Sequence, residues 1–143
     1  MNLNIKAIKN PNIKQLNQIK DIYIDAGWWY DYDNIKRLRK IINNTYLFVI
    51  ADVDGEIAGI ARVISDGVND AYIQDMAVKK TFRKNGIGSK IIRYILSHLK
   101  KKRFKWIGLV SENASDLFYK KLGFDYDSKK KTMIYETKKT RKR

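Results

Sequence analysis

The sequence predicts a single α/β domain in which helices cover both faces of a twisted, mostly antiparallel sheet of about seven strands. This prediction rests on apolar residues that recur at helical spacing between shorter runs of strand character. Residues 46–53 form an almost continuous apolar run, which is typical of a strand buried on both faces. Asp54-Gly55 follows directly and favours a tight turn between antiparallel strands.

The first third of the chain predicts one strand and two helices. Residues 3–8 alternate apolar and polar side chains, as a short strand does. Pro11 is expected at the first position of a helix, because its missing N–H needs no partner there, and Gly27 is expected to end that helix. The second helix is indicated by one apolar face, made of Ile35, Leu38, Ile41 and Ile42.

After the strand at 46–53, the rest of the chain predicts five more strands and two more helices. A helix after Gly88 is indicated by a stripe that includes Ile91, Ile95 and Leu99. The other elements are expected at residues 56–64, 71–78, 106–110, 114–122 (the short helix), 124–127 and 132–136. The expected order is therefore β-α-α-β-β-β-α-β-α-β-β, with one crossover, between the strands at 71–78 and 106–110. Residues 1–137 form the domain and residues 138–143 a basic tail. An edge strand at 132–136 would offer a surface for a homodimer.

The formal charge of +15 predicts attraction to polyanions, with nucleic acid and coenzyme A as the two candidates. Much of this charge lies in runs at residues 100–103, 129–131 and 138–143. No aromatic platform is interleaved with these runs, so solvated surface charge is favoured over nucleic-acid binding.

Composition also excludes several kinds of site. The chain has no cysteine, which removes disulfides, thiolate metal sites and a cysteine nucleophile. His98 is the one histidine, so no metal site is expected. No apolar run is long enough for a membrane span and the N-terminus lacks a signal-peptide core, so a cytoplasmic protein without a membrane partner is expected.

The turn Arg83-Lys84-Asn85-Gly86-Ile87-Gly88 joins a predicted strand to a predicted helix. The first N–H groups of a helix have no partner within the helix, and the helix dipole adds positive potential, so this turn favours a phosphate ligand. The spacing excludes a Walker loop, since Ser89-Lys90 follows Gly88 in the wrong order. It also excludes a dinucleotide fingerprint, because Ile91 stands where the third glycine belongs.

Two segments resemble the GNAT superfamily of N-acetyltransferases. Residues 83–88 resemble its (Gln/Arg)-x-x-Gly-x-(Gly/Ala) signature. Residues 113–124 resemble its Asn-x-x-Ala-x-x-(Leu/Phe)-Tyr-x-x-x-Gly-Phe segment, although Ala114 directly follows Asn113 here and the alanine register is shifted. The resemblance implies a GNAT-like fold and an acetyltransferase that uses acetyl-coenzyme A.

The resemblance also implies which residues bind this donor. The backbone N–H groups of Lys84, Asn85, Gly86, Ile87, Gly88 and Ser89 would hold the pyrophosphate. Arg83, Lys84 and Lys90 would add positive charge. The backbone of Met76, Ala77 and Val78 would pair with the pantetheine arm, and Asn113 would contact that arm. One N–H of this strand would polarise the thioester carbonyl.

The resemblance assigns Tyr119 as the acid that protonates the departing thiolate. Free tyrosine and thiol pKa values are close enough for such a transfer. A base or a water chain must deprotonate the amine, and Asp75 is the leading candidate, with Glu112 a weaker one. Tyr72 and Gln74 occupy positions where some members carry acidic or histidine groups, so a dedicated base is open to question.

The resemblance also implies that the acceptor side of the site lies between the first two helices. Trp28, Trp29 and Tyr30, with Tyr72, would wall a pocket in which aromatic faces and nearby carboxylates suit a cationic amine. The alternative is that the two tryptophans only anchor the loop to the core. The expected acceptor is a primary amine of a small molecule. The alternatives are a protein N-terminus or lysine, and a non-catalytic basic module that binds nucleic acid or the ribosome.

Overall fold

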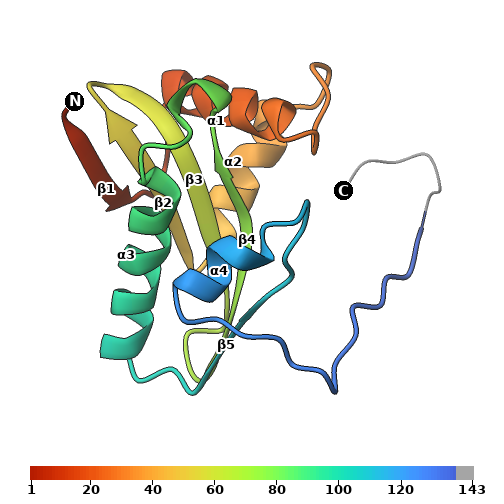
Figure 1. Cartoon of the computed structure of the whole chain (residues 1–143). Coiled ribbons are helices and arrows are strands. Elements are labelled where there is room, and N and C mark those ends of the chain that lie inside the picture. The colour runs from red at the N-terminus through yellow and green to blue at the C-terminus, as the bar shows by residue number, and fades with distance from the viewer. Residues whose placement is uncertain (138–143) are drawn as a thin grey trace.

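A computed structural model describes residues 1–137, so the basic tail at 138–143 lies outside the described residues. Its centre is one five-stranded sheet with the strands in sequence order (Figure 1). Strands β1 to β4 pair with one another in antiparallel fashion, and β5 runs parallel to β4, as the expected crossover requires. The strands are β1 (Leu3–Ala7), β2 (Leu47–Val53), β3 (Glu56–Ile64), β4 (Asp70–Val78) and β5 (Trp106–Leu109).

Helices lie on both faces of the sheet, which confirms the expected layering (Figure 1). They are α1 (Ile13–Asp25), α2 (Ile35–Asn44), α3 (Ile87–Lys101) and α4 (Asp116–Lys121), and a short 3-10 helix, η1 (Lys80–Phe82), precedes α3. One apolar cluster, here named the α1–α2 core, joins those helices to the sheet. The other, here named the α3 core, contains the buried face of α3 together with Tyr119 of α4.

Strand β2 divides its side chains between the two cores. Phe48 and Ile50 belong to the α1–α2 core, whereas Val49 and Ala51 belong to the α3 core. This explains the unbroken apolar run in the sequence, because successive strand residues point to opposite faces and both faces are covered. The turn after β2 has positive φ at both Asp54 and Gly55, the backbone conformation that tight hairpin turns favour.

Helix α1 begins at Ile13, two residues after Pro11, which the proline pattern predicts as the first helical position. Asn12 is the cap: its side chain accepts from the backbone N–H of Gln15 at 2.8 Å, and the Gln15 side chain accepts from the N–H of Asn12 at 3.0 Å. This reciprocal pair satisfies two donors that the first turn would otherwise leave unpaired. Pro11 therefore precedes the cap and is not helical.

The prediction of about seven strands is wrong, because residues 124–127 and 132–136 form no strand. Strand β5 offers an edge of only four residues, and three lysines at 129–131 precede the second segment and favour solvent. Met133 and Tyr135 are each 91% exposed. The edge strand through which a homodimer was expected is thus missing, and dimerisation stays a prediction. Within residues 1–137, no helix is both long and apolar enough to cross a membrane.

Ile95 tests the packing of α3 on the sheet. It is fully buried in the α3 core, so Ile95→Ala should lower the free energy of unfolding by about 2–5 kcal/mol. Arg93→Ala on the exposed face of the same helix should change it by less than about 0.5 kcal/mol. Chemical denaturation of both variants measures the difference, and equal losses would contradict this arrangement.

Candidate active site

Strands β4 and β5 separate halfway along β4, and this separation creates the site. β5 pairs only with Asp70 to Ile73, while the rest of β4 continues to Val78 with β3 alone as its described partner. The N–H and C=O groups on the open side of residues 74–78 therefore face two cavities instead of a neighbouring strand. Such an edge can pair with an extended ligand.

A β-bulge lies in β4 at the point where the strands separate. Ile60 pairs with Ala77 and Arg62 pairs with Gln74, so two β4 residues, Asp75 and Met76, lie opposite the single residue between them in β3. Asp75 has φ of 55°, in the left-handed region that aspartate tolerates better than most residues.

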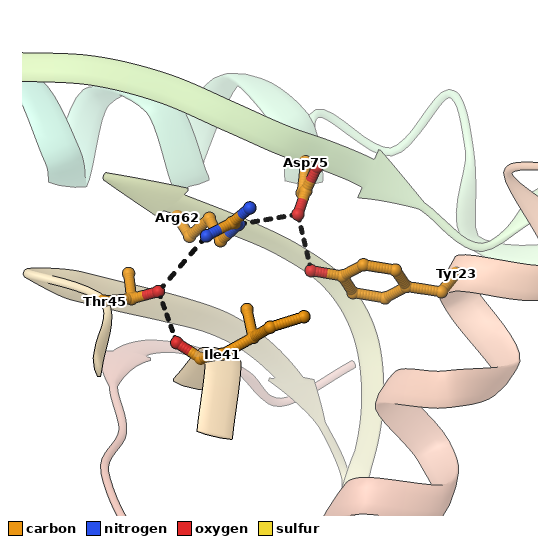
Figure 2. Close-up of polar contacts among 5 residues, drawn as sticks. All are labelled: Tyr23, Ile41, Thr45, Arg62 and Asp75. Carbon is orange, nitrogen blue, oxygen red and sulfur yellow. Dashed lines mark hydrogen bonds and ion pairs between the residues drawn. The ribbon is translucent and has the colours of Figure 1, made fainter. Parts of the chain in front are cut away.

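The Asp75 side chain is buried, with 6% of the residue exposed, and it is held by two donors (Figure 2). Arg62 Nε donates to Asp75 Oδ2 at 2.6 Å, and Tyr23 Oη donates to the same oxygen at 2.7 Å. Arg62 also reaches Thr45 Oγ1 at 3.5 Å, and that hydroxyl donates to the Ile41 carbonyl at 2.6 Å. This network joins α1, the end of α2, β3 and β4. Neither Arg62 nor Tyr23 was predicted from the sequence as a partner of Asp75.

The first cavity, here named the cofactor cleft, has a volume of about 710 Å³ and lies between β4, the glycine turn and α4. The expected donor-binding residues converge on it from segments far apart in the chain. Those that line it are Met76, Ala77, Val78, Arg83, Lys84, Gly86, Ile87, Gly88, Ser89 and Asn113. Asn85 does not line the cleft; its side-chain amide donates to the carbonyls of Phe82 and Arg83 and so holds the turn.

The N-terminus of α3 points its first turn at this cleft without a side-chain cap. Asn12 and Asn34 cap α1 and α2 with their side chains, but Gly86 at the start of α3 has none to offer. The first turn of α3 also contains no acidic residue. An anion in the cleft would therefore receive N–H donors and dipole potential that no side chain of this turn satisfies.

The two glycines of the turn are required for different reasons. Gly86 has φ of 73°, which a side chain at this position would strain. A Cβ on Gly88 would lie 3.2 Å from the Phe118 ring and 3.4 Å from Met76 Cε. Gly88 therefore allows α3, α4 and β4 to approach one another at the floor of the cleft. Phe118 was not foreseen, because the sequence motif treats its position only as an apolar one.

The second cavity, here named the acceptor pocket, has a volume of about 310 Å³ and adjoins the first. Tyr72, Asp75, Glu112 and Tyr119 line it. The two cavities share four residues, which form their common wall: Trp28, Met76, Asn113 and Ser115. The geometry thus brings the expected acid, the expected base and the end of the cofactor cleft to one place.

The three aromatic residues after α1 have different positions. Trp28 lines both cavities, and its ring meets that of Tyr23 edge-on at 5.6 Å. Trp29 is 8% exposed and belongs to the α1–α2 core, where it anchors the loop. Tyr30 lies at the surface, stacked on Tyr32 at 5.0 Å, and does not line either cavity. The two alternatives from the sequence therefore apply to different tryptophans.

Burial in the α3 core raises the pKa of Tyr119 to about 12, and the negative charge of Glu112 adds to the shift. Both causes disfavour the phenolate. Tyr119 therefore keeps its proton at neutral pH and is available as a donor. The gap between its pKa and that of a thiol is wider than the ordinary values imply.

Charge is divided between the two cavities. Arg83 and Lys84 line the cofactor cleft, alongside Asp25, which lies 3.8 Å from Arg83. Among the described residues that line the acceptor pocket, the charged ones are Asp75 and Glu112, both acidic. Because Asp75 is already paired with Arg62, the acidic character of the acceptor pocket rests mainly on Glu112.

Residues 15–124 match the Acetyltransferase (GNAT) family, so the chain belongs to this family of acetyltransferases. A relative from Pyropia yezoensis, described as an uncharacterized N-acetyltransferase, ycf52, is 28% identical over 127 residues, which cover 86% of this chain and 70% of the relative. The family membership confirms the resemblance drawn from residues 83–88 and 113–124.

Solved structures of similar fold belong to the same class. A probable acetyltransferase from Staphylococcus aureus superposes with a TM-score of 0.77 at 22% identity, over 94% of this chain and 99% of that one. A predicted acetyltransferase from Clostridium acetobutylicum, solved with acetyl-CoA, gives 0.73 at 23% identity, over 93% and 96% of the two chains. Within residues 1–137, no cluster of side chains suited to a metal ion is found.

Ser89 tests the anion site at α3. An aspartate in the first turn of a helix interacts favourably with the helix dipole, by about 0.3–1 kcal/mol. Ser89→Asp should therefore leave the melting temperature unchanged or raise it. The same charge should repel a pyrophosphate, and calorimetry should show acetyl-coenzyme A affinity reduced by about tenfold or more. Ser97→Asp, on the exposed face of the same helix, is the matched control and should bind normally. Unaltered affinity in Ser89→Asp would refute the pyrophosphate site.

The raised pKa of Tyr119 leads to a prediction for how kcat depends on pH at alkaline pH. Because the phenol keeps its proton until about pH 12, kcat should not fall through loss of this proton between about pH 7 and about pH 10. Steady-state rates of the wild type and of Tyr119→Phe across this range provide the measurement. An alkaline decline with a midpoint near the ordinary tyrosine value, present in the wild type and missing from Tyr119→Phe, would contradict the assignment.

Proposed function

We propose that the chain transfers the acetyl group of acetyl-coenzyme A directly to a primary amine of a small cationic molecule. The observation that carries the proposal is the wall shared by the cofactor cleft and the acceptor pocket, at Trp28, Met76, Asn113 and Ser115. Because the two cavities adjoin at these residues, a donor in one and an acceptor in the other would lie next to each other. The acetyl group would then need no covalent intermediate on a side chain. The absence of cysteine supports direct transfer, because the commonest acyl-enzyme nucleophile is missing.

The residues present fit acetyl-coenzyme A as the donor. The uncapped first turn of α3 and the basic side chains of Arg83 and Lys84 suit its pyrophosphate. The open edge of β4 at Met76 to Val78 suits the amide-bearing pantetheine arm, which can pair like an added strand. When bound, this donor supplies an activated thioester. The chain itself supplies position and the exclusion of water.

Charge and size support a small cationic acceptor. The acceptor pocket has the lower of the two volumes, about 310 Å³, near the lower limit of small-molecule pockets. Its charged lining residues are acidic, and the Trp28 ring offers an aromatic face to a cation. A linear diamine fits these features, since one amine can react while Glu112 holds the second as an ammonium group.

The proposed roles of the side chains follow from their positions. Tyr119, buried and protonated, would donate its proton to the sulfur as the C–S bond breaks and the new C–N bond forms. A cationic acceptor beside Glu112 would offset the charge that raises the pKa of Tyr119, and so ease this transfer. The nitrogen that attacks the thioester must release one proton to a base or to water, and Asp75 stays a prediction for that role.

The direct test is release of thiol from acetyl-coenzyme A with a panel of diamines, aminoglycosides, amino acids and peptides. Turnover is expected to be fastest with small diamines. Preference for peptides would move the proposal to a protein acceptor. Binding of acetyl-coenzyme A without turnover of any amine, together with salt-sensitive RNA binding, would favour the non-catalytic alternative.

Glu112 tests the choice of a cationic acceptor. Glu112→Gln should raise the KM of a diamine by about tenfold, the cost of one favourable charge contact of ~1.4 kcal/mol, while the KM of acetyl-coenzyme A stays unchanged. Asp66→Asn is the matched control, because Asp66 is exposed and does not line either cavity. An unaltered diamine KM in Glu112→Gln would contradict recognition by this carboxylate.

A further inference from the structure

The bulge at Asp75 decides which side chains of β4 reach each core. Ile73 belongs to the α3 core, so strict alternation would send Asp75 into the same apolar core. Instead Met76 and Val78 pack against the α3 core, and Ala77 packs against the α1–α2 core. The extra residue shifts the register by one and turns the Asp75 carboxylate toward Tyr23 and Arg62, where it is stabilised.

The partners of Asp75 come from β3 and α1, two elements that lie against β4. Arg62 is on β3, directly opposite Gln74, and its side chain is 17% exposed. Tyr23 is on α1 and is 2% exposed, with its ring 5.6 Å from Trp28 and 5.2 Å from Trp29. A buried carboxylate held by a guanidinium and a phenol in this way has a fixed position (Figure 2).

We propose that Asp75, Arg62 and Tyr23 act together as positioning residues for acetyl-coenzyme A. This inference rests on the proposed function and assigns Asp75 a role other than that of a base. By fixing the bulge, the three residues aim the backbone of Met76 and the residues after it at the cofactor cleft. The Asp75 oxygen that accepts from both donors is engaged in holding the strand.

Two of the residues that both cavities share, Met76 and Trp28, depend on the position of Asp75 and its partners. On the β4 side, Met76 follows Asp75 directly and lines both cavities. On the loop side, Trp28 lines both cavities and packs edge-on against Tyr23. Displacement of Asp75 would therefore alter the donor site on two sides. An effect on donor binding follows from a positioning role, whereas a base that acts on the amine would have none.

The experiment compares three substitutions in the full chain. Asp75→Asn keeps the size of the side chain and its tolerance of a left-handed backbone but removes the charge. Arg62→Lys keeps the charge but loses the Nε donor. Tyr23→Phe removes one hydroxyl and leaves the ring against Trp28 and Trp29. Arg39→Met is the control. Arg39 is also a part-buried arginine, and it donates a hydrogen bond to the Pro11 carbonyl and not to a residue of β4.

Calorimetric Kd values for acetyl-coenzyme A are the first readout. They should rise by about tenfold in Asp75→Asn and Arg62→Lys and by about threefold in Tyr23→Phe, and stay at the wild-type value in Arg39→Met. The pH profile of kcat is the second readout, and its shape should be unchanged in Asp75→Asn. A normal Kd in Asp75→Asn, with a large loss of kcat and of the acidic limb of the profile, would overturn the proposal in favour of a base.

Failure of the proposed function can be told apart from failure of this inference. A wild-type chain that binds acetyl-coenzyme A but acetylates no amine would refute the proposed acceptor, while the Kd comparison would still test the positioning role. If Asp75→Asn does not fold, Tyr23→Phe decides the outcome, because it removes a single hydrogen bond. A wild-type Kd in a folded Tyr23→Phe variant would overturn the proposal.

Discussion

The buried pair of Asp75 and Arg62 is the interaction on which the shape of the site depends. A carboxylate in a strand between two apolar cores is costly unless it is paired and hydrogen-bonded. Here a guanidinium and a phenol meet that requirement, and the side chain of Asp75 is 3% exposed. Removing one partner of such a pair costs about 3–5 kcal/mol, so the bulge that contains Asp75 is held firmly.

The two cavities follow from the bulge and from the short length of β5. Because β5 stops at Leu109, the last residues of β4 have an open side, and α3 begins close to that opening. One strand edge and one uncapped helix terminus therefore face the same cleft. The first suits an amide-bearing chain and the second suits a phosphate, which is the order in which these groups occur along coenzyme A.

The sequence predicted those parts of the fold that depend on local pattern. The bounds of β3, the turn at Asp54-Gly55 and the glycine turn before α3 are as expected, since periodicity and glycine spacing encode them directly. The residues around the donor could be predicted because the motif at 83–88 kept its spacing, as did Tyr119, Gly123 and Phe124 in the second motif. Residues 124–136 were wrongly predicted as strands, because strand-like composition does not supply a neighbouring edge to pair with.

The parts that the sequence could not predict depend on register and on distant contacts. Strict alternation hides the bulge, so nothing in the sequence indicated that Asp75 faces Tyr23, which is 52 positions away. Trp28 and Trp29 are identical residues in adjacent positions, yet one lines the cavities and the other is buried in the core. Only the packing of α1 against the sheet distinguishes them.

The central claim is that the open edge of β4 and the start of α3 bind one donor molecule together. Titration of the 15N-labelled chain with acetyl-coenzyme A, followed by amide NMR signals, tests it most directly. The signals of Met76 to Val78 and of Ile87 to Ser89 should shift together with a single Kd, while those of α2 stay in place. Shifts confined to the basic surface at residues 100–103, with β4 unaffected, would contradict the claim.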